Sequence, residues 1–265
     1  MAEPVLLIGC GRMGGSLLRG WLESGAVDRA IAVEPMPQGI PVGVELAADL
    51  GAVPDPLPNT ILLAVKPQIL DSVLPGLKVR LPASALVISI AAGKPLAYFA
   101  DRLGTSVATI RTMPNTPAAI GRGISVAVPN GRVSAAQRAL CDRLLQAGGP
   151  VEWVEDERLI DVVTATSGGG PAYVFLLIEA MAAGGVAAGL PPDLAMKLAR
   201  TTVSGAGELA VQSPDESAEQ LRKNVTSPNG TTQAALAVLM AEGGVTDLMV
   251  QAIAAATHRS RELAD

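Results

Sequence analysis

Histidine and cysteine are scarce in this chain. Its 265 residues include one histidine, His258, and two cysteines, Cys10 and Cys141. Two cysteines so far apart do not form a disulfide framework, so we expect a protein of the reducing cytoplasm. A single histidine excludes a metal site built on a pair of histidines, and the charged stretch around His258 favours a solvent-facing side chain. The sequence therefore predicts no metal centre.

Basic charge is also in short supply. Lysine and arginine together number 20 against 25 aspartate and glutamate residues, which gives a formal net charge of -5. No run of basic residues resembles a surface that follows nucleic-acid phosphates, so we expect no nucleic-acid partner. Residues 1–4 lack the positive segment with which a signal peptide begins, and we expect no leader.

The chain has no long run of purely apolar residues. Its longest hydrophobic stretch, residues 172–190, contains Glu179 and three glycines, whereas a membrane span needs roughly 20 clean apolar residues. We interpret this stretch as a helix buried in protein rather than in a membrane. A helix that is apolar on nearly every side needs cover on every side. In so short a chain a second subunit is the expected cover, which predicts a homo-oligomer of at least two copies.

Glycine, by contrast, is abundant, and three glycines near the amino end form a pattern. Residues 5–8 are a continuous apolar run, typical of a parallel strand buried on both faces, and an amphipathic helix follows as far as Gly25. Between them, Gly9, Gly11 and Gly14 have the spacing G-x-G-x-x-G, which permits a tight turn, close approach of a pyrophosphate and close helix packing, in that order. A triplet can arise by chance among 28 glycines. The flanking strand and helix nevertheless favour dinucleotide binding over a plain turn, with phosphates bound at the helix N-terminus.

An acidic residue, Glu34, follows the second expected strand. An acid at this position can bond the ribose hydroxyls and repel a 2′-phosphate, which favours NADH over NADPH. The alternative is a solvated charge at the end of a strand. Arg12, inside the glycine turn, could neutralise either a phosphate or Glu34 itself. The cofactor is therefore NADPH or NADH, with the preference open.

Strand-like and helical segments alternate through the first part of the chain, and from about residue 157 the pattern is helical throughout. This alternation predicts an α/β protein with a right-handed, mostly parallel, doubly wound sheet. We expect a Rossmann-like dinucleotide-binding domain over residues 1–155 and an all-helical dimerisation and substrate-binding domain over residues 156–265. Lys66 and Pro67 follow the third strand at the edge where ligands bind, or form an ordinary loop. The expected strands are residues 5–8, 30–33, 60–65, 86–90, 107–110, 124–128 and 151–154, with helices at 44–50 and 135–147.

Two glycine-bearing loops, residues 167–171 and 226–232, are expected to interrupt the helical half. In the second, Gly230, Thr231 and Thr232 open a helix, where free N–H groups and hydroxyls can bind a small carboxylate. A threonine that merely caps the helix would need no ligand. Ser227 adds a third hydroxyl where one would cap, which favours a ligand. The expected helices are residues 159–165, 173–188, 192–211, 216–222 and 232–240, with one more to the end of the chain.

Several of these stretches together resemble pyrroline-5-carboxylate reductase, the enzyme that completes proline synthesis. The resemblance runs the length of the chain. NVTSPNGTTQAAL at 224–236 is its most specific part, because other Rossmann dehydrogenases do not carry it. The remaining segments are GCGRMGG at 9–15, AVKP at 64–67, SIAAG at 89–93, RTMPNTP at 111–117, SGGGPAYVF at 167–175 and RSREL at 259–263.

The resemblance implies an oxidoreductase that reduces 1-pyrroline-5-carboxylate to L-proline with hydride from NADPH or NADH. It also implies an interlocked dimer in which the substrate loop of one subunit meets the cofactor of another. Thr232 would be the catalytic residue, with its hydroxyl facing the ring nitrogen. Besides Glu34, the implied cofactor residues are Gly9, Cys10, Gly11, Arg12, Met13, Gly14, Ala64, Val65, Lys66, Pro67, Ala92 and Asn115. The implied substrate residues are Ser227, Gly230, Thr231 and Thr232, with Asn224 and Glu157 completing the pocket.

Three residues depart from the family pattern. Gly169 stands where serine is usual, Arg12 stands where asparagine is usual, and many members lack an acid at Glu34. These departures bear on one pocket hydroxyl and on cofactor preference, not on the reaction. One rival, a β-hydroxyacid dehydrogenase, uses a lysine on the helix after a glycine cluster, and residues 173–190 contain none. A second rival, a non-catalytic NAD-sensing protein, would have no need of the hydroxyl-rich loop.

Overall fold

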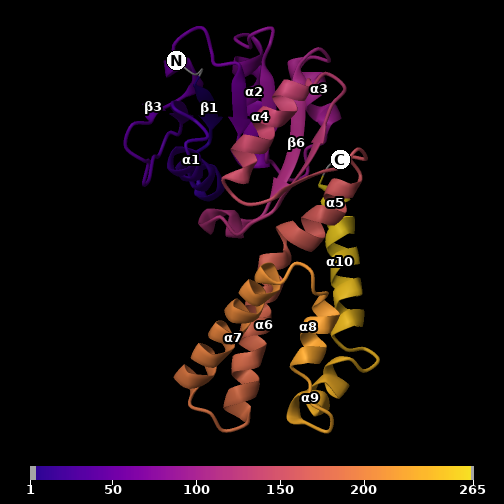
Figure 1. Cartoon of the computed structure of the whole chain (residues 1–265). Coiled ribbons are helices and arrows are strands. Elements are labelled where there is room, and N and C mark those ends of the chain that lie inside the picture. The colour runs from indigo at the N-terminus through magenta and orange to yellow at the C-terminus, as the bar shows by residue number, and fades with distance from the viewer. Residues whose placement is uncertain (1–3, 264–265) are drawn as a thin grey trace. The chain divides into compact units, whose positions relative to one another are not determined.

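A computed structural model describes residues 4–263 and divides the chain into two compact units (Figure 1). The first unit extends to Gly169 and takes up the chain again from Ala256. The second unit is Gly170–Ala255. The chain therefore passes between the units twice.

One eight-stranded sheet forms the centre of the first unit, in the order β3-β2-β1-β4-β5-β6-β7-β8. Every pairing in it is parallel except that of β6 with β7. The order reverses direction at β1, which places a topological switch point between β1 and β4. The strands are β1 Val5–Ile8, β2 Ala30–Val33, β3 Glu45–Ala47, β4 Thr60–Leu63, β5 Leu86–Ser89, β6 Ala108–Pro114, β7 Ser125–Pro129 and β8 Val151–Trp153.

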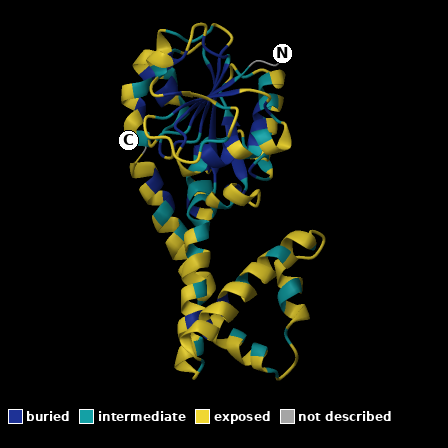
Figure 2. Cartoon of the chain, turned by 90° about the vertical axis from the view of Figure 1, so that its left-hand side faces the viewer, coloured by how far each residue is buried: buried dark blue, intermediate teal, exposed yellow. Residues whose placement is uncertain are grey.

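Helices cover both faces of this sheet. Successive strand residues point to opposite faces, so Leu7 packs in one core with Trp21 of α1, and Leu6 packs in the other with Leu74 of α2 and Phe99 of α3. All five side chains are buried, and Figure 2 shows the strands of the sheet mostly in the colour of buried residues. The doubly wound arrangement expected from the sequence is confirmed. The helices of this unit are α1 Arg12–Ser24, α2 Leu70–Lys78, α3 Leu96–Leu103, α4 Ala135–Gln146 and α5 Leu159–Val163.

The short helix expected at residues 44–50 is wrong. This segment forms the edge strand β3, in which Leu46 lies opposite Ala32 and Ala47 opposite Val33, followed by a 3-10 turn at Leu50–Ala52. A pattern of only seven residues is compatible with either structure, and pairing with β2 satisfies the backbone of this one. Helices α2 and α3 were not singled out from the sequence.

The glycine cluster at residues 167–171 is helical and is not the expected loop. After α5 the chain forms a π-helical turn at Thr164–Gly168, in which the Gly169 N–H donates to the Thr164 carbonyl at 2.8 Å. Helix α6 begins at Gly170. A π-turn inserts one residue into a helix, and such turns are frequent at functional sites. The three glycines therefore mark an altered helix, not its interruption.

Packing on the sheet explains where the two units divide. The division lies at Gly169, whereas the sequence placed a boundary between residues 155 and 156. Ile160 of α5 is fully buried in a cluster with Met113 of β6 and Val126 of β7. Helix α5 therefore belongs with the sheet, and the chain leaves the first unit only after the π-turn.

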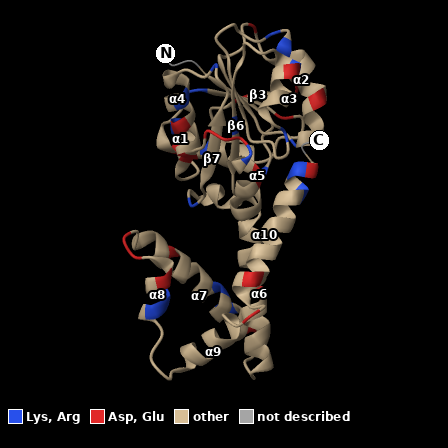
Figure 3. Ribbon diagram, turned by 90° about the vertical axis from the view of Figure 1, so that its right-hand side faces the viewer, with Lys and Arg blue, Asp and Glu red and all other residues tan. Residues whose placement is uncertain are grey.

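The second unit consists of helices. Its α6 and α7 pack through the small residues Ala182, Ala195 and Ala199. Almost none of the α6 ribbon has a charged residue's colour in Figure 3, and Glu179 is the one charged residue of the helix. Residues 159–187 are long and apolar enough to cross a membrane by length and composition alone, and 6% of the relevant window is buried. The remaining helices are α6 Gly170–Ala187, α7 Pro192–Gln212, α8 Ala218–Asn224, α9 Thr231–Leu239 and α10 Val245–Glu262.

Candidate functional site

The glycine turn between β1 and α1 has the geometry that a dinucleotide site needs. Gly9 has a φ of +94°, and a Cβ on it would lie 2.8 Å from the backbone of Ala64. A Cβ on Gly14 would lie 2.2 Å from the Gly9 carbonyl oxygen, so only glycine lets α1 pack this closely. At Gly11 nothing lies within 4 Å of that position. The turn thus leaves open space at the glycine where a pyrophosphate would approach.

Within the described residues, no side chain caps the start of α1. Gly11 is the N-cap, and it makes no side-chain cap hydrogen bond. No acidic residue lies in the first turn, which includes Arg12 and Met13. The first N–H groups of a helix lack intrahelical acceptors and carry a partial positive charge. This helix end can therefore bind an anion.

A crevice of about 830 Å³ opens beside the glycine turn, at the carboxyl ends of β1, β2 and β4. Its position at the switch point of the sheet is where ligands bind in folds of this class. The volume is within the range of about 300–1,000 Å³ that is typical of ligand and cofactor pockets. Predicted cofactor residues lining it are Gly9, Gly11, Glu34, Ala64, Val65 and Lys66.

Glu34 forms part of the crevice wall and is held by two backbone groups. Its carboxylate accepts a hydrogen bond from the Cys10 N–H at 2.9 Å and another from the Met36 N–H at 3.2 Å. On the other side of Glu34 is a smaller cavity of about 310 Å³, which Arg12 and Arg19 also line. Burial and the Glu34 charge raise the pKa of the Cys10 thiol. Glu34 is thus a fixed acid and not a freely solvated one.

Seven predicted cofactor residues do not line the crevice: Cys10, Arg12, Met13, Gly14, Pro67, Ala92 and Asn115. Asn115 follows β6, and its amide donates to Ser167 Oγ at 3.1 Å and accepts from the Ile124 N–H at 3.0 Å. Ala92 lies between β5 and α3, at the carboxyl edge of the sheet. Pro67 begins the 3-10 turn after Lys66. Pro67, Ala92 and Asn115 border the ends of β4, β5 and β6, neighbouring strands on one side of the switch point.

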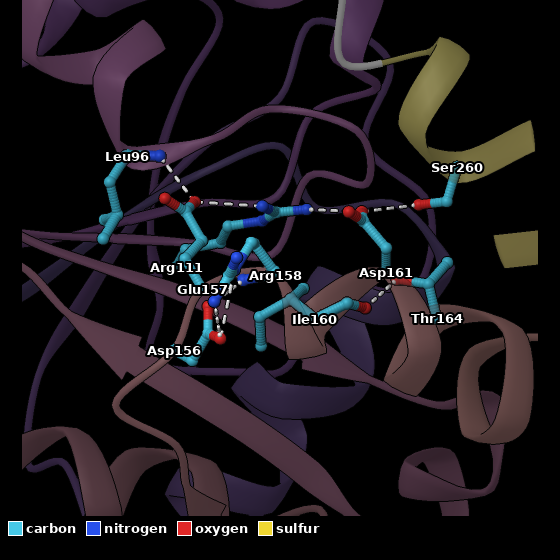
Figure 4. A network of polar contacts seen from close by, with 9 residues as sticks. All are labelled: Leu96, Arg111, Asp156, Glu157, Arg158, Ile160, Asp161, Thr164 and Ser260. Carbon is cyan, nitrogen blue, oxygen red and sulfur yellow. Dashed lines mark hydrogen bonds and ion pairs between the residues drawn. The ribbon is translucent and has the colours of Figure 1, made fainter. Parts of the chain in front are cut away.

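Glu157, a predicted substrate residue, belongs to a buried polar network (Figure 4). Its Oε1 accepts from Arg111 Nη1 at 2.9 Å and from the Leu96 N–H at 2.7 Å. Arg111 Nη2 also lies 3.5 Å from Asp161 Oδ1, which accepts from Ser260 Oγ at 2.9 Å. The sequence analysis did not single out Arg111, Asp161 or Ser260. The available signal was an arginine within the buried strand β6, which has no other charged residue.

The turn before α9 leaves its hydroxyl groups available. Gly230 is the N-cap of α9 and no side chain caps the helix, so neither Thr231 nor Thr232 acts as the cap. Within residues 4–263, the hydroxyls of Ser227, Thr231 and Thr232 make no recorded hydrogen bond. Asn229 has a φ of +57° and its N–H donates to the side chain of Gln233. Uncapped N–H groups and three hydroxyls therefore lie together at one helix end.

Asn224, also predicted in the substrate pocket, is engaged within its own unit. Its amide donates to Glu216 Oε2 at 2.8 Å and accepts from Gln220 Nε2 at 2.7 Å. The first unit holds Glu157 and the second holds the residues from Asn224 to Thr232. Within the described residues, no group of three histidine, cysteine or acidic side chains is placed to hold a metal ion.

Comparison with known proteins bears on both units. Residues 157–263 match the family model of the pyrroline-5-carboxylate reductase dimerisation domain, and residues 4–93 match the model of the coenzyme F420-dependent NADP oxidoreductases. The chain is 41% identical to the pyrroline-5-carboxylate reductase of Pseudomonas aeruginosa over 273 residues, covering 100% of this chain and 98% of that protein. The chain belongs to the pyrroline-5-carboxylate reductase family.

Solved structures of the pyrroline-5-carboxylate reductase family share the whole architecture. The enzyme from Coxiella burnetii matches with a TM-score of 0.91 and 31% identity over 100% of both chains. A Plasmodium falciparum pyrroline carboxylate reductase with NADP bound matches with a TM-score of 0.85 and 28% identity, covering 99% of this chain and 98% of that one. Family membership makes the chain an oxidoreductase with a dimerisation domain, which indicates a homo-oligomer.

Proposed function

We propose that this chain reduces 1-pyrroline-5-carboxylate to L-proline with NADH or NADPH, the last step of proline biosynthesis. The proposal rests on one observation: this member of the family has two helix N-termini that no side chain caps. One faces the glycine-turn crevice and the other bears three hydroxyls. The first suits a dinucleotide pyrophosphate and the second suits a small carboxylate.

The residues of the crevice fit a nicotinamide dinucleotide. Gly9 to Gly14, including Cys10, Arg12 and Met13, would hold the pyrophosphate on the start of α1, because a Cβ at Gly14 would meet the Gly9 carbonyl and Gly11 has open space. Ala64 to Pro67 would border the cofactor further along, with Ala92 and Asn115 beside the nicotinamide. When bound, the reduced nicotinamide supplies the hydride.

The turn before α9 would hold the substrate. The N–H groups and hydroxyls of Ser227, Gly230 and Thr231 would bind the carboxylate, and the Thr232 hydroxyl would polarise the ring nitrogen. A C=N carbon accepts hydride readily only when its nitrogen is protonated or hydrogen-bonded, and the substrate can bind already protonated. The hydride then reduces C5 of the iminium and its nitrogen becomes the amine of proline. Orientation by the protein therefore supplies most of the rate.

Asn224 and Glu157 would complete the pocket by supporting it. Asn224 is fixed by Glu216 and Gln220, and Glu157 by Arg111 and Leu96. We place the substrate turn of one subunit against the cofactor of another, with interlocked helical units. The exposed apolar side chains of α6 support a second copy as their cover, in preference to a membrane. No nucleic-acid partner is proposed, and two buried free thiols fit a cytoplasmic location.

For cofactor choice, we assign NADH preference to Glu34. Its carboxylate is fixed by two N–H groups on the wall of the crevice, where it can accept hydrogen bonds from ribose hydroxyls. A 2′-phosphate placed there would meet a like charge. Arg12 and Arg19, which line the cavity beyond Glu34, temper that repulsion without removing it.

The direct test of the activity is consumption of reduced nicotinamide by the purified protein when it is given 1-pyrroline-5-carboxylate. We expect proline to accumulate in proportion to the cofactor oxidised. Binding of NADH without turnover would instead indicate the NAD-sensing alternative. That alternative is disfavoured because it leaves the hydroxyls of Ser227, Thr231 and Thr232, which do not cap α9, without a role.

A further inference from the structure

Arg111 is a buried cation at the centre of the network in Figure 4. Its side chain is 3% exposed, with Glu157 at 2.9 Å and Asp161 at 3.5 Å. Within the described part of the chain, its Nε and Nη2 atoms have no hydrogen-bond partner. Removing an ion from water costs several kcal/mol, and attraction within a network of this kind often only balances that cost. Stability alone therefore does not explain why this strand carries an arginine.

Each of the two acids beside Arg111 holds a different element. Glu157 accepts the N–H of Leu96, the first residue of α3, where helical N–H groups lack partners of their own. Asp161 accepts the hydroxyl of Ser260, near the end of α10. Arg111 thus links the start of α3 to the end of the last helix.

The same two elements enclose the segment between β5 and α3, residues 90–95. Gly93 in this segment has a φ of +70°, and a Cβ on it would lie 3.2 Å from the Leu263 carbonyl oxygen. Leu263 directly follows α10, and its own N–H donates to the Arg259 carbonyl at 3.2 Å. The hydrogen bonds and ion pairs of Arg111, together with the close approach of Gly93 to Leu263, form a closed loop of neighbouring groups. It runs from Arg111 through Glu157 to the end of the segment, and returns through Leu263, Ser260 and Asp161.

The enclosed segment lies where a bound nicotinamide is expected. Arg111 pairs in register with Ser89, the last residue of β5, and the Ser89 hydroxyl accepts the Ala91 N–H at 3.2 Å. Residues beyond Ser89 therefore emerge at the carboxyl edge of the sheet, where cofactors of this fold bind. Ala92 is the residue proposed above to border the ring.

We infer that Arg111 is a positioning residue for the nicotinamide half of the cofactor. It touches neither the cofactor nor the substrate. It acts through Glu157 and Asp161, which fix the two elements enclosing residues 90–95 and thereby set the surface on which the ring rests. The inference rests on the proposed function only for the placement of the nicotinamide ring. Loss of these contacts would misplace the nicotinamide end of the cofactor, while its adenosine half stays bound in the crevice.

The test compares how variants bind NADH and ADP-ribose, which lacks the nicotinamide. Arg111→Met leaves two partly buried acids without their shared cation and can fail to fold, so the informative variants are Asp161→Asn and Ser260→Ala. We expect each to weaken NADH binding about 5- to 10-fold, the effect of losing one or two hydrogen bonds. ADP-ribose binding should stay within about 2-fold of the wild type, because its site lies in the crevice.

Asp156→Asn is the matched control. Asp156 pairs with Arg158 at 2.8 Å on the surface next to Glu157, whereas the ion pairs of Arg111 are with Glu157 and Asp161. This variant should leave both affinities unchanged. Equal losses for NADH and ADP-ribose, or no loss for either ligand, would overturn the inference. Because binding needs no turnover, this result is separate from the question of whether the protein reduces the cyclic imine.

Discussion

The hydroxyl of Thr232 is the single side-chain group to which we assign a part in the chemistry. It lies in the first turn of α9, whose N-cap is Gly230 and which no side chain caps. Thr232→Ala should lower kcat by about 10- to 100-fold, since the ring nitrogen loses its polarising partner but keeps its proton. Thr232→Ser retains the hydroxyl and should keep most of the rate. An unchanged kcat in the alanine variant would remove Thr232 from the mechanism.

The second prediction for a single residue concerns Glu34. Glu34→Ser removes the acid and frees the Cys10 and Met36 N–H groups, while Arg12 and Arg19 stay in the adjacent cavity. We expect the ratio of kcat/KM for NADPH to that for NADH to rise about 10- to 100-fold, which corresponds to about 1.4 to 2.8 kcal/mol of relieved repulsion.

The control for Glu34→Ser is Glu45→Ser on the edge strand β3. Glu45 is half exposed and pairs with Arg29 at the surface, and it does not line the crevice. Its substitution should leave the cofactor ratio unchanged. The same ratio before and after Glu34→Ser would mean that Glu34 takes no part in cofactor choice.

At the scale of single residues, the sequence allowed us to predict those site residues that a local pattern fixes. Gly9, Gly11, Gly14 and Glu34 were predicted because a strand, a turn and a helix place them in a fixed relation. Arg111 was missed because its meaning depends on partners far along the chain. Glu157 lies 46 residues from it, and Asp161 lies 99 residues from Ser260. No short pattern connects residues at such separations.

Among the elements, the join of β1 and α1 allows two glycines to be distinguished by experiment. Gly14→Ala adds a methyl group 2.2 Å from the Gly9 carbonyl and should destabilise the unliganded protein by about 1–3 kcal/mol, as overpacking does. Gly11→Ala meets nothing within 4 Å and should cost less, about 0.5–1 kcal/mol, because alanine is a poorer N-cap than glycine.

For cofactor binding, Gly11→Ala should be the more damaging of the two variants. Gly11→Ala places its methyl group where the pyrophosphate would approach, so NADH binding should fall at least tenfold although the fold is intact. Denaturant unfolding of the free protein and titration with NADH measure the two effects separately. Equal stability of the two variants would contradict the close packing at Gly14.

Most elements lie close to where the sequence placed them, including the three-residue strand β8, but the helices α2 and α3, the edge strand β3 and the π-turn were not predicted. The buried runs of β1, β4 and β5 and the long helices α6, α7 and α10 lie close to where the sequence placed them. Residues 44–50 were too few for their period to separate a helix from the edge strand β3. The glycines of residues 167–171 suggested a loop, but a π-turn keeps the chain helical there.

For the whole molecule, the division into units follows burial and not the change of pattern. The helical pattern begins near residue 157, yet Ile160 packs against the sheet and the first unit extends to Gly169. The family's dimerisation model begins at residue 157, where the pattern changes. Assigning cofactor binding to residues 1–155 and dimerisation to residues 156–265 remains a prediction, since α5 and the end of α10 contribute to the first unit.

The surface of α6 argues for a second copy of the chain. Phe175, Leu176 and Leu177 are 59%, 64% and 50% exposed. Three consecutive helical residues point about 100° apart, so apolar side chains are exposed around much of α6. Covering them is favourable, because each fully buried one contributes about 1.5–3 kcal/mol. This helix lies in the region that matches the family's dimerisation model, so we expect another subunit to cover it.

Phe175→Glu should therefore dissociate the oligomer, since it would place a charge within an apolar interface in both subunits. We expect sedimentation to show monomers at concentrations where the wild type is assembled. Reductase activity should fall together with assembly, because the proposed substrate turn and cofactor come from different subunits. Val79→Glu, at an 82% exposed position after α2, is the matched control and should alter neither property. A monomeric Phe175→Glu variant with full activity would show that one chain holds the complete site.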